Sequence, residues 1–208
     1  MMTEPSEGFE WLLEYGPLGD VYCVAFVRGC TPREVLERFG VDEETVEEMS
    51  FERFERVSSE LAEALQGDSG GYVGAVEAGE WTVLVEPSGY RAARDRELLK
   101  WLCEGTEVVA LNVNPYASEY FVHAADRDVV VSFEPVTPHE RSGADPGRWD
   151  DAMREVGLGQ RGYDEPPAGD PRAAAFALAG RITGVPFTRD ILSRPFLAAV
   201  IATARGMV

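Results

Sequence analysis

A chain of 208 residues, 45% of them hydrophobic, is long enough for one domain with a substantial core. Its formal net charge of −18 repels nucleic acid and anionic membrane surfaces, which excludes both as partners, and attracts basic surfaces. The three cysteines contain no CxxC pair and the two histidines lack helical ligand spacing, so we expect neither disulfides nor a metal site, and no cofactor.

Two stretches bear on membranes and export. The apolar run "PFLAAVIATA", residues 195–204, is about half of the roughly 20 residues needed to cross a bilayer. The N-terminal residues 1–16 carry four acids and no base, the opposite of an export signal. We therefore expect a cytoplasmic protein without a membrane-spanning segment.

The first regular elements are a strand and a helix. Residues 20–29, "DVYCVAFVRG", are rich in β-branched and aromatic residues and predict a buried strand. Residues 31–40, "TPREVLERFG", predict a helix because Thr31 and Glu34 form a capping box and Gly40 closes the end.

Two acidic segments follow. Residues 42–49 predict a short acidic turn of helix, and residues 50–67 predict an amphipathic helix with an acidic outer face. Residues 1–68 hold 17 acids and 5 bases, a net of −12 that leaves −6 for the other 140 residues. One interpretation is a solvated face that serves solubility, and the other is a surface for a basic protein partner. The residues that would carry the second are Glu43, Glu44, Glu47, Glu48, Glu52 and Glu55.

The middle of the chain is mostly strand. Runs of β-branched and aromatic residues between turn signals predict five strands, with one helix, residues 94–105, between the second and the third. The five strands are residues 72–77, 81–86, 107–113, 119–124 and 128–134.

Beyond Pro135 the composition changes to loops and helices. A polar loop leads to a helix within residues 147–157. The glycine- and proline-rich residues 158–170 predict a linker, and residues 171–184 an alanine-rich helix. Further helical pieces are expected from Thr188 to about Arg205, broken near Pro195.

These elements predict an α+β fold with a mixed, mainly antiparallel sheet of about six strands packed by helices. We expect a core in residues 1–157, a loop or linker in residues 158–170, and a C-terminal helical segment in residues 171–208 docked on the core, one domain overall. The apolar end of that segment is a candidate dimer interface, formed by Phe196, Leu197, Val200 and Ile201.

Two strands end in the same way, at Glu86-Pro87 and at Glu134-Pro135. The residues between the strands 81–86 and 107–113 are enough for a crossover, so these two strands should point the same way. Two tight turns then reverse the chain twice, which predicts one shared sheet edge. The residues expected at that edge are Glu86, Asn112, Asn114 and Glu134.

Carboxylates with nearby amides can bind a cation, orient a hydroxylated ligand, or act as a general acid and base. His123 would join this cluster if its side chain turned inward. The alternative is structural, because a Glu before a Pro is also an ordinary solvent-facing end to a strand. No pattern of a nucleophile, a phosphate-binding loop or a metal motif was found, which leaves the cluster as a speculative ligand site without catalytic residues.

The order of blocks in this chain resembles a family of uncharacterised, mostly actinobacterial proteins known only as a domain of unknown function. The blocks that carry the resemblance are "CVAFVRGCTPREVLERFG", "GEWTVLVEPSGYR", "GTEVVALNVN" to "DRDVVVSFEP", "DPGRWDDAMREVGL" and "ALAGRITGVPFT". They cover most of residues 20–190, and the acidic residues 41–68 are the least family-like portion. The resemblance implies a single architecture and no established activity.

The leading functional hypothesis is a non-enzymatic interaction protein, like an inhibitor or immunity protein, whose acidic face engages a basic partner. It depends on the charge of residues 1–68 and on the lack of a catalytic pattern. The alternative is an enzyme or a small-ligand or cation binder that uses the Glu and Asn cluster at the sheet edge.

Overall fold

The computed structural model describes residues 8–12, 18–65, 71–114, 119–159 and 169–202. Within these residues one eight-stranded sheet runs in the order β2-β8-β3-β4-β1-β5-β6-β7, and every pairing is antiparallel. The strands are β1 (Tyr22–Arg28), β2 (Glu47–Met49), β3 (Tyr72–Ala78), β4 (Trp81–Pro87), β5 (Glu107–Val113), β6 (Tyr120–Ala125), β7 (Asp128–Phe133) and β8 (Phe196–Val200).

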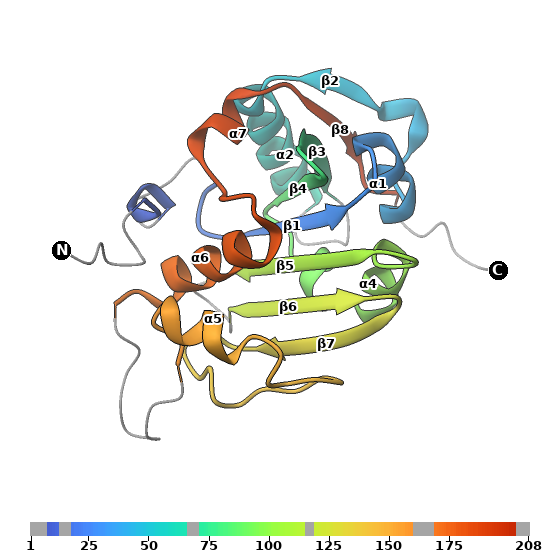
Figure 1. The fold of residues 1–208 in the computed structure, drawn as a ribbon. Helices are drawn as coiled ribbons and strands as arrows, with labels where there is room; N and C mark the ends of the chain where they lie inside the picture. Colours follow the sequence, from blue (N-terminus) through green and yellow to red (C-terminus); the bar gives the residue numbers. More distant parts are fainter. Residues whose placement is uncertain (1–7, 13–17, 66–70, 115–118, 160–168, 203–208) are drawn as a thin grey trace.

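Helices cover both faces of the sheet (Figure 1). Their bounds are η1 (Glu10–Leu12), α1 (Pro32–Phe39), η2 (Glu43–Thr45), α2 (Phe51–Leu65), α3 (Arg91–Arg94), α4 (Arg96–Leu102), α5 (Asp150–Glu155), α6 (Pro171–Thr183) and α7 (Arg189–Ser193). The apolar side chains of η1, α2, α5, α6 and α7 share one core with one face of the sheet, and those of α1, α3 and α4 share a second core with the other face. The fold is thus a sheet between two helical layers.

Local sequence signals set several helix ends as predicted. The capping box of Thr31 and Glu34 begins α1, and Gly40 ends it in the left-handed conformation at φ 83°. Asp170 caps α6 with its side chain, and Gly184 ends that helix at φ 71°. These ends depend on contacts within one turn, which a sequence displays directly.

The sheet has eight strands where the sequence indicated about six, because two short strands were read as helix. The acidic turn predicted within residues 42–49 contains a 3-10 turn and then β2, which is only three residues long. The helical pieces predicted from Thr188 are wrong beyond Ser193, since residues 196–200 form β8. Alanine-rich apolar runs favour buried helix and buried strand alike, and the pairing partners decide between them.

The last strand lies inside the sheet, not on its surface. β8 pairs with β2 on one side and with β3 on the other, and α6 packs on β5. Phe196 and Ile201, which the sequence proposed for a dimer interface, are buried in the two cores of the chain itself. The C-terminal segment is therefore part of the same packed structure as the sheet.

The strands 81–86 and 107–113 of the prediction do run in the same direction. They are β4 and β5, and each pairs antiparallel with β1, which lies between them. β7 runs the same way as β5 because β6 reverses the chain between them. The ends of β4, β5 and β7 consequently share one edge of the sheet, called here the carboxyl edge.

Candidate functional site

At the carboxyl edge, Cys23 of β1 lies between two polar residues that the sequence placed together. Cys23 pairs with Glu86 of β4 on one side and with Asn112 of β5 on the other. Directly paired residues project from the same face of a sheet. All three side chains therefore face the layer formed by α1, α3 and α4.

Glu86 is fully buried and holds the first turn of α3. Its Oε1 accepts a hydrogen bond from the amide of Ala92 at 2.7 Å, and its Oε2 accepts one from the amide of Arg91 at 3.1 Å. Burial raises the pKa of Glu86 to about 7, although these amides and the Cys23 thiol, which also bonds the carboxylate, lower it. The chain is so close here that a Cβ on Gly89 would lie 2.8 Å from Oε2. Glu86 thus serves as an internal helix cap.

Asn112 orients a cation. Its Oδ1 accepts a hydrogen bond from Nε of Arg94 at 3.0 Å, and the same guanidinium lies over the ring of Tyr120, 4.5 Å from the centroid. Tyr120 pairs with Asn112 across β5 and β6, so it lies on the same face. The stacked ring and the amide oxygen therefore hold the planar guanidinium in a fixed orientation.

Arg94 stands at one end of a groove of about 650 Å³ between α3, α4 and the strands β6 and β7. The volume is in the range of small-molecule sites. The floor consists of Tyr120, Val122 and Ala124 of β6 with Val129 and Ser132 of β7. One wall is the surface of α3 and α4 with Ala93, Leu99 and Cys103, and the opposite wall is residues 142–144.

Among the residues that the structure describes, four cations and one carboxylate line this groove. The cations are Arg94, Arg96, Lys100 and Arg127, and the acid is Asp128. In a chain of net charge −18, this is a local reversal of sign. Arg96 and Lys100 are four residues apart on α4, so they project from the same side of the helix. Such a groove attracts an anion.

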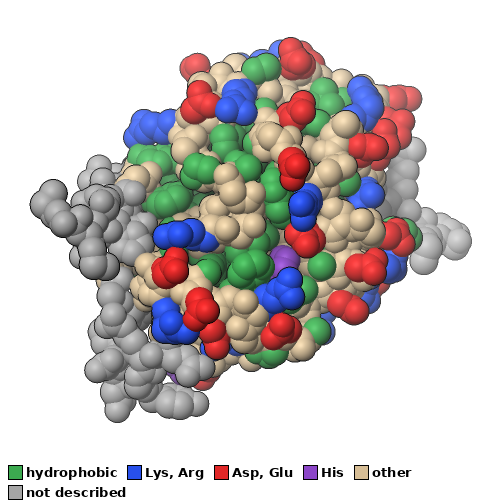
Figure 2. Space-filling model, viewed as in Figure 1, with side chains coloured by type: hydrophobic (Ala, Val, Ile, Leu, Met, Phe, Trp, Pro, Cys, Tyr) green, Lys and Arg blue, Asp and Glu red, His purple; other side chains and the backbone are tan. Residues whose placement is uncertain are grey.

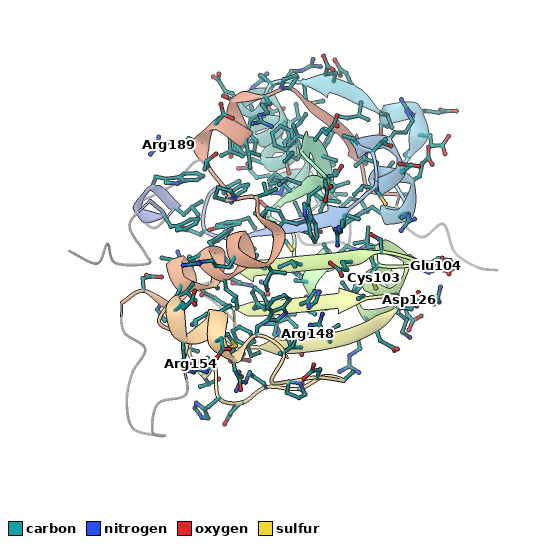
Figure 3. The ribbon with its side chains drawn as sticks, in the orientation of Figure 1. Cys103, Glu104, Asp126, Arg148, Arg154 and Arg189 are labelled. Atoms are coloured by element: carbon teal, nitrogen blue, oxygen red, sulfur yellow. The ribbon has the colours of Figure 1, made fainter. Side chains whose placement is uncertain are left out.

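The groove cations differ in how they are held. Lys100 pairs with Glu97 at 2.6 Å, and Arg127 pairs with Glu104 at 2.7 Å while its guanidinium lies 5.1 Å from the centre of the Trp101 ring. Figure 3 shows Glu104 near Cys103 and Asp126, where α4 ends and β6 turns into β7. Within the described residues Arg96 has no ion-pair partner. Arg96 is thus the most available cation for a ligand.

The outer wall of the groove is fixed to the edge of β7. Ser142 exchanges two backbone hydrogen bonds with Ser132, at 2.8 and 3.0 Å, and their hydroxyls are 3.0 Å apart. Gly143 has φ 130°, and a Cβ at this position would lie 2.3 Å from the carbonyl oxygen of Val130. Glycine is therefore required where this wall meets β7.

The other predicted edge residues lie apart from Glu86. Asn114 follows β5 at the carboxyl edge, next to β1 and β6. Glu134 follows β7, four strand positions from β4, which at about 4.8 Å per strand is roughly 19 Å away. The structure thus brings Glu86 and Asn112 together around Cys23 and leaves Glu134 at the far side of the edge.

His123 lies on the opposite face of the sheet. It pairs with Val109 and Val131, whose side chains belong to the core under α5 and α6. Its Nδ1 accepts a hydrogen bond from Nε1 of Trp149 at 3.0 Å, its Nε2 is buried without a partner, and burial lowers its pKa. His123 therefore cannot reach Glu86 or Asn112 through the sheet.

The six predicted acidic residues lie along η2, β2 and the start of α2, the end of the sheet farthest from β7. Arg53 neutralises Glu47 with two hydrogen bonds of 2.6 and 2.9 Å. Across the described ranges no ion pair involves the other five, Glu43, Glu44, Glu48, Glu52 and Glu55. Figure 2 shows acidic side chains gathered at the upper right of the molecule, where η2 and β2 lie in Figure 1.

Two further searches cover the described part of the chain. No group of three or more His, Cys, Asp or Glu residues there is arranged to hold a metal ion. Among its helices, none combines the length and the apolar character that a bilayer crossing requires.

The fold and the groove define a class of protein, an antiparallel α+β sheet protein with a cationic groove on one face and an acidic rim. This rim consists of Glu43, Glu44, Glu47, Glu48, Glu52 and Glu55. The chain belongs to a family described as a family of unknown function, DUF6461, whose match spans residues 2–205. Neither the curated proteins nor the solved structures include a match to it.

Proposed function

We propose that the protein is a non-enzymatic binding protein that holds a small organic anion in the groove between α3, α4, β6 and β7. One observation carries the proposal: the four cations that line a groove of about 650 Å³ in a chain with a net charge of −18. Cationic side chains that serve only solubility would be scattered over the surface, whereas these four gather around one concave surface. The proposed ligand differs from the sheet-edge alternative of the sequence analysis, an enzyme or a small-ligand or cation binder that uses the Glu and Asn cluster.

The arrangement of Glu86 supports binding over catalysis. Its two carboxylate oxygens are occupied by the amides of Arg91 and Ala92, and its side chain is sealed from solvent. A buried carboxylate with both oxygens engaged cannot reach a substrate as a base. Its part in the proposed function is to hold α3, and through α3 the position of Arg94.

Amide NMR spectra during titration with sodium acetate at fixed ionic strength test the proposal. We expect shifts confined to the groove, around Arg94, Arg96 and Ser142, with a double variant Arg96→Gln and Lys100→Gln losing them. The matched control is Arg56→Gln, which removes a cation from α2 on the other face of the sheet. Shifts that spread over the surface, or that persist in the double variant, would remove the groove as the binding site.

A second candidate function is the engagement of a basic protein by the acidic rim. It is favoured by the five glutamates that lack an ion-pair partner in the described residues, four of them exposed. Exposed charges that face no counter-ion accelerate encounter with an oppositely charged partner.

The immobilised protein should retain a basic protein from native extract at low salt and release it at high salt. A triple variant with Glu43, Glu44 and Glu48 replaced by Gln should retain no basic protein. If the basic protein is retained both at high salt and by the triple variant, this candidate function is refuted.

We also propose that the protein acts in the cytoplasm of an actinobacterium. Arginine supplies all but one of its 19 basic residues, which fits GC-rich coding. Fractionation of cells that express the native gene should place the chain in the soluble cytoplasmic fraction.

A further inference from the structure

We infer that the partner of the acidic rim presents an extended basic segment, which adds to the sheet as a further strand beside β2. This inference rests on the second candidate function and names the form in which its basic partner binds. Three features support it: an open backbone edge at β2, the charges along that edge, and free space on the sheet face next to it.

The two edges of the sheet differ in whether their backbone is covered. Along β7, Ser142, Ala144 and Asp145 form backbone hydrogen bonds of between 2.8 and 3.0 Å with residues 129–132. β2, at the top of the sheet in Figure 1, pairs only with β8 among the described residues. An uncovered edge strand is a template for pairing with an extended segment of another chain. The β2 edge is therefore open where the β7 edge is closed.

Glu48 is the residue of β2 whose backbone points away from the sheet. The amide and the carbonyl of Val200 in β8 both point toward the β2 side, since they form hydrogen bonds of 2.9 Å with residues 42–45, the segment that leads into β2. Backbone direction alternates along a strand, so Ala198 points the same way and its partner Glu47 points back at it. The N–H and C=O of Glu48, the next residue, then face outward and can pair with a further strand.

The charges along this edge select a basic segment. Glu47 and Glu48 are exposed, and Glu43, Glu44 and Glu52 lie in the flanking elements. A second copy of the chain, paired through β2, would bring the glutamates of the two strands together, and like charges opposite one another destabilise a pair of strands. Lysine or arginine on an added strand would instead face opposite charges. The same glutamates that protect the edge from self-association therefore favour a basic strand.

The sheet face beside Glu48 has room for the side chains of an added strand. Glu48 borders a shallow hollow of about 490 Å³ between the start of α1 and the strands β3 and β8. In this hollow Leu197, which pairs with Glu48, is half-buried, and Pro195 is exposed. The hollow is also bordered by two arginines, of which Arg194 is held in an ion pair of 2.6 Å and Arg33 is outnumbered by the glutamates of the rim. α1 therefore leaves the space beside β2 uncovered.

Two peptides with the same charge test the inference. One alternates four lysines with three valines. In the other, proline replaces each valine, which removes N–H groups and the extended pairing that a strand requires. Binding of each peptide to the full chain is measured at low salt by calorimetry. We expect the lysine-valine peptide to bind at least about tenfold more tightly, because only this peptide can exchange backbone hydrogen bonds with Glu48.

Hydrogen exchange of the Glu48 amide, followed by NMR, locates the added strand directly. In the free protein this amide faces solvent and should exchange quickly, whereas the amides of Glu47 and Met49 face β8 and should be protected. Saturation with the lysine-valine peptide should slow exchange at Glu48 by at least about tenfold and leave Glu47 and Met49 unchanged. The lysine-proline peptide should leave exchange at Glu48 fast.

Two variants of Glu48 separate charge from pairing. Glu48→Gln removes the charge but keeps the N–H, so it should weaken both peptides by the same factor. Glu48→Pro removes the same charge and also the outward N–H, so it should reduce the affinity for the lysine-valine peptide to that for the lysine-proline peptide. Circular dichroism and thermal unfolding show whether each variant is folded. If Glu48→Pro is not folded, the exchange of the Glu48 amide in the parent decides.

The outcomes separate this inference from the acidic-rim function. If both peptides bind equally and exchange at Glu48 does not change, the rim attracts positive charge and the added strand is wrong. The added strand is also wrong if the lysine-valine peptide binds a folded Glu48→Pro variant as tightly as it binds Glu48→Gln. If neither peptide binds at low salt, both the added strand and the rim as a surface for basic partners fail.

Discussion

Asn112 on the sheet fixes Arg94 on the helix, since its Oδ1 accepts a hydrogen bond from Nε at 3.0 Å. A residue that is itself almost fully buried thus orients a cation of the groove. Replacing Asn112 by Ala should lower the affinity for acetate about fivefold and the free energy of unfolding by about 1 kcal/mol, the worth of one such bond. Calorimetry and urea unfolding measure the two. Unchanged affinity in a variant that has lost stability would mean that Asn112 has only a structural role.

The buried Glu86 gives the protein a specific pH dependence of stability. Its pKa is raised from 4.5 to about 7 in the folded protein, so between these values the folded state binds a proton that the unfolded chain does not. Stability from this group is therefore fully present below pH 4.5 and is lost as the pH rises through 7, by at most about 3 kcal/mol.

The variant Glu86→Gln isolates this dependence from the other carboxylates. The difference in unfolding free energy between the parent and Glu86→Gln should change between pH 4.5 and 7 and be flat above pH 8. Urea unfolding across this range measures it, with Glu134→Gln, at a half-buried carboxyl, as the control. A constant difference would show that Glu86 stays ionised throughout.

Gly143 sets the outer wall of the groove. Its φ of 130° and the carbonyl oxygen of Val130, 2.3 Å from an added Cβ, both oppose a side chain. Gly143→Ala should cost roughly 2–3 kcal/mol of stability and weaken acetate binding, because the wall must move away from β7. Gly79→Ala is the control, with φ 69° but open space, and should cost about 1 kcal/mol with binding intact. Equal losses for the two variants would contradict this account.

The aromatic cluster of Phe196 in β8 with Phe51 and Phe54 in α2 should contribute most of the stability at the end of the sheet formed by β2, β8 and β3. Phe196 is fully buried and lies 5.6 and 5.7 Å, centroid to centroid, from Phe51 and Phe54 of α2. Phe196→Ala should cost about 3–5 kcal/mol. A chain truncated after Gly184 should fail to fold, as β2 and β3 lose their shared partner. Circular dichroism reports both, and a folded truncated chain would show that β8 is dispensable.

The sequence was most informative where a structure depends on neighbours in the chain. The six strands that it predicted are β1, β3, β4, β5, β6 and β7, and the caps of α1 and α6 are as expected. β2 was missed because glutamate is rare in strands, and β8 because alanine favours helix. In both cases the pairing between Glu47–Met49 and residues 196–198, which are remote in sequence, outweighs local preference.

For the site, strand direction could be predicted and side-chain surroundings could not. Placing Glu86 and Asn112 at one edge required only turn lengths, but the burial of Glu86 depends on how α3 closes over it. The groove joins Arg94, Arg96 and Lys100 from one segment to Arg127 and residues 142–144 from others. The spacing of Arg96 and Lys100 was the one local signal of a cationic helix face.

The position of β8 has a consequence for how the chain is made. Tyr72 and Val200 are direct partners although 128 residues separate them (200 − 72), and β8 fills the space between β2 and β3. Until β8 has been synthesised, β3 has an unpaired backbone edge and the aromatic side chains of α2 lack their partner Phe196. Slow, late completion of this kind exposes a nascent protein to aggregation, so its yield in vivo should depend on chaperones that shield it during synthesis.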